Sequence, residues 1–136
     1  MTSKSVEVQG RVWLRTNGKS LLGKGRLELL RHIEATGSIS KAAKAMKMSY
    51  KSAWDAVDAM NNAMGMPIVE SASGGTRGGG SRLTDAGRRL IREFQLLEER
   101  HRQWLEAASQ EFFGAAVQTA PEIVARWKMK IIGLYC

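Results

Sequence analysis

Few side chains in this sequence are placed to carry out chemistry on a substrate. His32 and His101 stand far apart on stretches with helical spacing, and the single cysteine, Cys136, is the last residue. A nucleophile needs a base within hydrogen-bond reach, and a metal site needs several ligands at short spacings. The sequence offers neither pattern. We therefore expect no catalytic residues, no metal ligands and no cofactor, and we expect that the protein is not an enzyme.

The carboxylate pairs and the glycine-rich stretch also favour roles other than catalysis. Glu98 with Glu99 is typical of a solvated helix face, and Asp55 with Asp58 falls on the exposed side of a short helix. The stretch GGTRGGG lacks the lysine that follows the last glycine of a Walker loop, and no dinucleotide-binding strand precedes it. It indicates the tip of a β-hairpin, which glycine allows to approach another surface closely.

The segment best suited to recognise another molecule is SISKAAKAMKMSYKSAWDAVDAM, residues 38–60, in which Ser38 and Ser49 can each cap a short helix. Small and apolar residues share one face of each helix: Ile39, Ala42, Ala43 and Met46 in the first, and Ala53, Val57, Met60 and Met64 in the second. Only Lys47, Met48 and Ser49 join them, and alanines at the contact allow a steep crossing. This predicts a helix-turn-helix, with an αα-hairpin inside a helical bundle as the alternative.

A helix-turn-helix places the first residues of its second helix in the major groove of DNA. Hydroxyl, lysine and aromatic side chains there can reach base edges and phosphates, so the expected contacts are Ser49, Tyr50, Lys51 and Ser52. Alternatively, Ser49 only caps the helix and Tyr50 only packs. Trp54, one step off the apolar row, is expected to anchor the edge of the core. The cations expected to meet the DNA backbone are Lys41, Lys44 and Lys47.

The segments before this motif supply the rest of a small core. VEVQGRVWLRT alternates apolar residues and is broken by Gly10, which predicts a strand with a bulge, and TNGKS and LLGKG predict turns. RLELLRHIEATG places Leu29, Leu30 and Ile33 on one side of a helix that ends at Gly37. We expect this helix to be the first of the core.

The segment after the motif predicts a basic β-hairpin. IVESASGGTRGGGSRLT holds two short apolar runs around the glycine loop, where Arg77 and Arg82 supply positive charge. A helix-turn-helix followed at once by such a hairpin has the element order of a winged helix. We therefore expect a mainly α fold with a small β-hairpin, in which residues 1–84 form the DNA-binding domain, about 49–64 its recognition helix and about 67–84 its wing.

A long helix is predicted over residues 85–113, capped by Thr84 and with Asp85 at its positive end. At about 1.5 Å per residue it spans on the order of 40 Å, which is more than the small core can cover. We expect a second copy of the chain to cover its distal half, so that the protein is a homodimer. The residues expected to dimerise are Leu90, Phe94, Leu97, His101, Trp104 and Leu105. Residues 114–136 are expected to form a C-terminal tail.

Charge and composition agree with a polyanionic partner. The 136 residues carry a net charge of +8, and Arg11 through Lys51 contains ten basic side chains but two acidic ones. One cysteine excludes an intrachain disulfide, which fits a reducing cytoplasm. The sequence has neither a long apolar run for a membrane span nor an apolar signal segment at its polar start. We expect a cytoplasmic protein that binds double-stranded DNA and not a membrane.

Two stretches together resemble a known family. GSISKAAKAMKMSYKSAWDAVDAMN, followed by GGTRGGGSRLTDAGRRLI, is similar to the N-terminal DNA-binding domain of the ModE family of molybdate-responsive transcriptional regulators. A more distant similarity is to the winged helix of LysR-type regulators. The resemblance covers about residues 20–105. It implies a homodimer that binds a palindromic operator and regulates genes of molybdate uptake or use, with Thr76 and Arg77 of the wing added to the DNA contacts.

The chain departs from that family in one respect. Full-length members continue into oxyanion-binding β-barrel domains, and only 23 residues follow from Gly114. We expect the chain to lack such a domain, so no molybdate ligand is carried over. The alternative functions are an interaction module that pairs with a full-length regulator, and an oxyanion sensor at a dimer interface.

Overall fold

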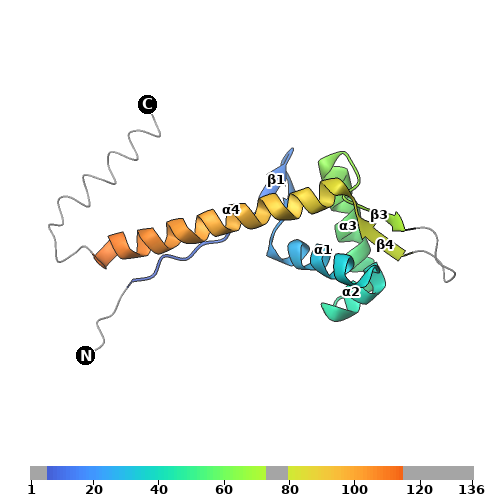
Figure 1. Cartoon of the computed structure of the whole chain (residues 1–136), viewed down its shortest axis with the longest axis horizontal. Helices are drawn as coiled ribbons and strands as arrows, with labels where there is room; N and C mark the ends of the chain where they lie inside the picture. The colour runs from blue at the N-terminus through green and yellow to red at the C-terminus, as the bar shows by residue number, and fades with distance from the viewer. Residues whose placement is uncertain (1–5, 73–79, 115–136) are drawn as a thin grey trace. The chain divides into compact units, whose positions relative to one another are not determined.

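The computed structural model describes residues 6–72 and 80–114. Within these ranges, four α-helices accompany two separate two-stranded antiparallel sheets, as Figure 1 shows. The elements are β1 (Leu14–Thr16), β2 (Lys19–Leu22), α1 (Lys24–Thr36), α2 (Ile39–Ala45), α3 (Tyr50–Met64), β3 (Val69–Ala72), β4 (Gly80–Leu83), α4 (Asp85–Ser109) and a π-helical turn (Gln110–Gly114). The predicted winged helix-turn-helix followed by a long helix is confirmed. Thr76, Arg77 and the predicted tail beyond Gly114 lie outside the described residues.

The first strand is shorter than the sequence predicts. Residues 6–13 form no strand, and β1 begins only at Leu14, where it pairs with β2 around a turn. Asn17 and Gly18 have φ values of 51° and 75°, the paired positive values of a tight hairpin turn. The turn predicted for residues 21–25 is wrong at its start, because Leu21 and Leu22 belong to β2 and are buried in the core.

The helix-turn-helix is built by α2 and α3, with α1 packed against α2. Gly37 ends α1 in the left-handed conformation, with φ of 68°. Ala42, Ala43 and Ala53 are buried, and these small side chains allow the helices to approach closely. Met48, in the turn, packs against the core. The apolar spacing therefore gives both the helices and their contact faces correctly.

The wing is the β3–β4 hairpin, which is held at both of its strands by other elements. The amide of Ser81 in β4 donates a 2.9 Å hydrogen bond to the carbonyl of Gly37, at the end of α1. A Cβ on Gly80 would lie 2.7 Å from that same carbonyl oxygen, so only glycine fits there. Figure 1 shows the two strands beside α3.

The helix α4 takes part in two compact units. Of the described residues, those of Val12–Leu97 form one unit, and 6–11 form another with 98–114. The division falls within α4, between Leu97 and Glu98. Thr84 caps the helix as predicted, because its hydroxyl accepts a hydrogen bond from the amide of Gly87 at 3.1 Å.

The core lies in the unit formed by Val12–Leu97. Burying a large aliphatic or aromatic side chain stabilises a fold by roughly 1.5 to 3 kcal/mol, so a few such residues dominate the stability of this unit. Its largest fully buried side chains are Phe94, Leu22, Leu29, Leu30, Ile33, Met60 and Ile68. They come from β2, α1, α3, α4 and the residue before β3, so every element around the helix-turn-helix depends on this one core.

Candidate nucleic-acid interface

The start of α3 is fixed by its N-cap residue, Ser49, together with Ser52 in the first turn. The Oγ of Ser49 accepts a 3.0 Å hydrogen bond from the amide of Ser52 and donates to the Oγ of Ser52 at 2.9 Å. Capping satisfies a backbone N–H group that has no partner within the helix. Both hydroxyls are exposed but already engaged, so their first role is to hold the end of α3 in place.

The exposed face of α3 carries aromatic rings and a balanced charge pair. Tyr50 and Trp54 are 54 % and 48 % exposed, one helical turn apart. The Nζ of Lys51 lies 3.3 Å from a carboxylate oxygen of Asp55, so its charge is partly met within the helix. The expectation that Trp54 anchors the core edge is wrong: it is half exposed and does not belong to the core cluster.

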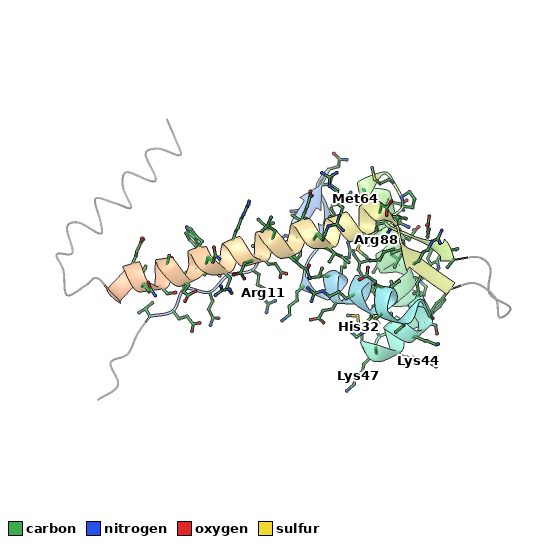
Figure 2. All side chains as sticks on the ribbon, in the orientation of Figure 1. Arg11, His32, Lys44, Lys47, Met64 and Arg88 are labelled. Carbon is green, nitrogen blue, oxygen red and sulfur yellow. The ribbon has the colours of Figure 1, made fainter. Side chains whose placement is uncertain are left out.

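The free cations of this surface lie on α2 and in the turn. Lys41, Lys44 and Lys47 are exposed, and none makes an ion pair with another described residue. Figure 2 shows Lys44 and Lys47 at the same end of the helix-turn-helix, with the side chain of Lys47 pointing away from the ribbon. These lysines therefore provide positive charge beside the N-terminus of α3, where the helix dipole also favours an anion.

Lys47 has an unusual backbone conformation. Its φ is +56°, in the left-handed region that glycine adopts most easily, and its amide donates a 3.1 Å hydrogen bond to the carbonyl of Lys44. Besides Asn17, it is the only non-glycine residue with a positive φ in the described ranges 6–72 and 80–114. Asparagine tolerates this region better than lysine does. The turn thus holds a long cation where a smaller residue would be less strained.

The wing contributes one described arginine. The Nε of Arg82, in β4, donates a 2.9 Å hydrogen bond to a carboxylate oxygen of Glu70, in β3, and both side chains remain exposed. Arg82 therefore braces the two strands against each other. It lies opposite Glu70 in the strand register, which places the pair on one face of the hairpin.

Asn61 is a positioning residue that the sequence reasoning missed. Its Oδ1 accepts hydrogen bonds from the amides of Ile68 and Val69 at 2.8 and 3.3 Å, and its Nδ2 donates to the carbonyl of Val69 at 3.2 Å. These bonds fix the start of the wing against α3. In the sequence, Asn61 stands on the second helix, shortly before a proline and a strand. Because asparagine is common on exposed helix faces, this position gave only a weak indication of its role.

Another contact ties the base of the wing to α4. The amide and hydroxyl of Thr84 donate to the carbonyls of Ile68 and Pro67, at 3.0 and 2.8 Å. A Cβ on Gly87 would lie 2.2 Å from the carbonyl oxygen of Ile68. Because the neighbouring atoms belong to the backbone, a side chain at Gly87 cannot be accommodated without moving the strand.

The residues predicted to dimerise divide into two groups. Leu90 and Phe94 are buried in the core of their own chain, so in this conformation their side chains are not available to a partner. Leu97 and Trp104 are 38 % and 51 % exposed, and the ring of His101 stacks on that of Trp104 with centroids 6.4 Å apart. Dimerisation stays a prediction for the second group, which also includes Leu105.

Residues 6–10 run along the distal half of α4. The amide of Val8 donates a 2.7 Å hydrogen bond to the Oγ of Ser109, which itself donates to the carbonyl of Leu105. A Cβ on Gly10 would lie 3.3 Å from the ring of His101. The backbone of residues 6–10 is therefore hydrogen-bonded to a side chain of α4 and not to a neighbouring strand. This explains why the predicted strand does not extend to these residues.

Charges on the distal half of α4 are largely paired along the helix. Arg102 contacts Glu99 at 2.7 Å and Glu106 at 3.0 Å. Hydrogen bonds and the nearby charge of Arg102 hold the pKa of Glu99 below its ordinary value, and the same contacts raise the pKa of Arg102. All three side chains are exposed, so solvent weakens these interactions.

Within residues 6–72 and 80–114, no group of three or more His, Cys, Asp or Glu side chains is arranged to hold a metal ion. Over the same ranges, no helix combines the length and apolar character needed to cross a membrane.

The segment that holds the candidate interface matches a known family model. Residues 25–88 match the model of the bacterial regulatory helix-turn-helix proteins of the LysR family. Among solved structures, a LysR family transcriptional regulator is similar with a TM-score of 0.47 and 19 % identity, over 73 % of this chain and 31 % of that one.

Two of three further relatives carry molybdenum in their names. The molybdenum transport protein ModE of Azotobacter vinelandii is 39 % identical over 123 residues, which cover 88 % of this chain and 46 % of the relative. The molybdenum-pterin-binding protein MopB of Rhodobacter capsulatus is 47 % identical over 66 % of this chain and 33 % of its own length. The DNA-binding transcriptional dual regulator ModE of Escherichia coli K12 is 50 % identical over 54 % of this chain and 28 % of its own. This chain thus spans less than half the length of each, and the resemblance to ModE found in the sequence is confirmed.

Proposed function

We propose that this chain, whose residues 25–88 match the model of the bacterial regulatory helix-turn-helix proteins of the LysR family, is a sequence-specific regulator of transcription that binds double-stranded DNA. The observation that supports this most directly is the arrangement of α2 and α3. The capped, exposed start of α3 stands beside the exposed lysines Lys44 and Lys47. Such a surface lets a helix read base edges while cations neutralise phosphates.

The proposed DNA contacts are of two kinds, with the phosphate backbone and with base edges. Lys41, Lys44 and Lys47 bind the phosphate backbone, together with Thr76, Arg77 and Arg82 of the wing sequence. Tyr50 and Lys51 lie at the start of α3, where side chains reach the floor of the major groove. Ser49 and Ser52 hold that helix end in position, and their hydroxyls can still meet a phosphate.

The regulator is further proposed to act as a homodimer through the distal half of α4. Leu97 and Trp104 are exposed on a helical stretch where, among the described residues 98–112, only Ala108 is buried. A second copy of the same face would remove these apolar surfaces from water. Two recognition helices related by a two-fold axis would then bind a palindromic operator.

The proposed target genes are those of molybdenum uptake or use, and the support is the names of the relatives. ModE of Azotobacter vinelandii is named for molybdenum transport, and its alignment reaches 88 % of this chain. Purifying genomic DNA fragments bound by the protein would test the link: we expect enrichment upstream of molybdate transporter genes. Enrichment only at unrelated promoters would contradict this part of the proposal.

Binding itself is tested by selection from a pool of random duplexes, followed by affinity measurements at several salt concentrations. We expect an enriched palindromic site and an affinity that falls steeply with added salt, because bound phosphates release counterions. Lys44→Ala should reduce the slope of log K against log salt by about 0.9 for each phosphate that the variant no longer neutralises. Lys19→Ala, at the turn between β1 and β2, is the matched control and should leave the slope unchanged. A pool without any enriched site would refute sequence-specific binding.

A further inference from the structure

The outward face of α3 has a composition that does not suit phosphate binding. Its charged residues are Lys51, Asp55 and Asp58, so carboxylates outnumber the one cation, and that cation is paired with Asp55 at 3.3 Å. Carboxylates near a phosphate backbone cost free energy, because like charges repel across a short distance. The middle of α3 is therefore unlike α2, where lysines face outward.

The largest side chains on this face are two aromatic rings. Tyr50 and Trp54 are about half exposed, and within the described residues neither the phenol hydroxyl nor the indole N–H makes a hydrogen bond. They line a groove of about 320 Å³ together with Asp58 of α3 and with Glu70, Ser71 and Ser81 of the wing strands. Two large apolar surfaces thus stand between the helix and the wing.

The major groove of DNA presents one apolar group, the C5 methyl of thymine, among its hydrogen-bonding groups. An aromatic face on a helix in that groove can bury this methyl without displacing any hydrogen bond. Resting on the proposed function, we propose that Tyr50 and Trp54 are specificity-determining residues that contact thymine methyl groups in each half-site. Trp54 then acts in recognition as well as Tyr50, and the capping serines serve to position them.

The inference is tested by removing the methyl groups from the DNA one at a time. In the site selected by the wild-type protein, each thymine is replaced by deoxyuridine, which pairs identically and lacks the methyl. At one or two thymines in each half-site, we expect the affinity of the wild-type protein to fall about fourfold per methyl, the effect of exposing one methyl-sized apolar group. Replacement at other thymines should change the affinity little.

The same DNA series is then measured with Trp54→Ala and Tyr50→Ala. Each variant should bind the thymine site more weakly and should lose the penalty at the thymine that its own ring contacts. This loss of sensitivity is a coupling between ring and methyl, which a merely structural role would not produce. Trp13→Ala removes another exposed tryptophan and is the control; it should keep the full fourfold penalty. Thermal melting of each variant shows whether the fold is intact, and Trp54→Phe provides a milder change.

The outcomes separate this inference from the proposed function. If the wild-type protein selects a site but binds its deoxyuridine version equally tightly, the inference is overturned and the proposed function stands. The inference is also overturned if Trp54→Ala and Tyr50→Ala, both folded, keep the full methyl penalty. If no site is selected at all, both proposals fall together.

Discussion

The helix-turn-helix unit and the distal half of α4 differ in how far their large apolar side chains are buried. Phe94, on the proximal part of α4, is 1 % exposed, whereas Trp104, further along the same helix, is 51 % exposed. The first half of the helix is stabilised by the core of its own chain. The second half keeps exposed apolar side chains such as Trp104, although residues 6–10 run along it. One continuous helix therefore combines a part that is packed against the core of its own chain with a part whose apolar side chains remain exposed and could be buried by a partner.

The largest contrast should come from truncating those two side chains. Phe94→Ala removes a fully buried ring and should destabilise the fold by about 3 to 5 kcal/mol. Trp104→Ala, on an exposed surface, should change the stability of the helix-turn-helix unit by less than about 0.5 kcal/mol but weaken self-association. Urea unfolding followed by circular dichroism measures the first effect, and sedimentation velocity measures the second. Equal losses of stability would break the distinction between the two halves.

Glycine substitutions sharpen the comparison within the helix-turn-helix unit itself. Gly87→Ala would place a Cβ 2.2 Å from the carbonyl oxygen of Ile68 and should cost roughly 3 kcal/mol, because backbone must move. Gly25→Ala is the matched control: it lies in α1, and a Cβ there would meet nothing within 4 Å. That change should stabilise the helix by about 0.5 to 1 kcal/mol. Thermal unfolding of both variants would reveal any departure from these opposite signs.

A third change separates stability from binding at one residue. Lys47→Gly relieves the left-handed conformation of a lysine and should stabilise the fold by about 0.5 to 1 kcal/mol. It also removes a cation, so DNA affinity should fall and the salt dependence should become shallower by about 0.9 in slope. Lys47→Ala keeps the backbone strain and removes only the charge. If Lys47→Gly bound DNA as tightly as the wild-type protein does, the lysine would have no part in the interface.

The smallest effect is expected on the distal half of α4. The pKa of Glu99 is lowered by Arg102, so the stability that this carboxylate contributes is present above its unfolded pKa and is lost as the pH falls through its folded pKa. Because both groups are exposed, we expect no measurable change in melting temperature. Side-chain carboxyl resonances should instead show Glu99 titrating at lower pH in the wild-type protein than in Arg102→Ala. Identical titration curves would show that the ion pair is absent in solution.

Sequence patterns predicted the helices far better than the strands. Apolar residues at helical spacing, the capping serines and Gly37 defined α1, α2 and α3, because each helix is specified by residues close together in the chain. Residues 6–13 alternate as a strand would, yet those of them at 6–10 lie along α4, through the hydrogen bond from Val8 to Ser109. Alternating apolar and polar residues indicate an extended chain. The pattern does not indicate whether another strand lies close enough to pair with it.

The candidate interface shows a similar limit. The order of a helix-turn-helix and a basic hairpin was evident from the sequence. The exposure of the lysines of the helix-turn-helix was also evident, because the alanines beside them mark the buried face of the helix. The exposure of Trp54 was not evident, since one step around a helix decides between core and solvent. The anchoring role of Asn61 depends on contacts with Ile68 and Val69, which only the folded chain brings within reach.

The wing is tied down at its two strands by different neighbours, β3 by the amide of Asn61 and β4 by the carbonyl of Gly37. Both ties are made by residues of the strands themselves. The position of each strand therefore depends on a helix next to it, α3 for β3 and the end of α1 for β4, as well as on its pairing with the other strand.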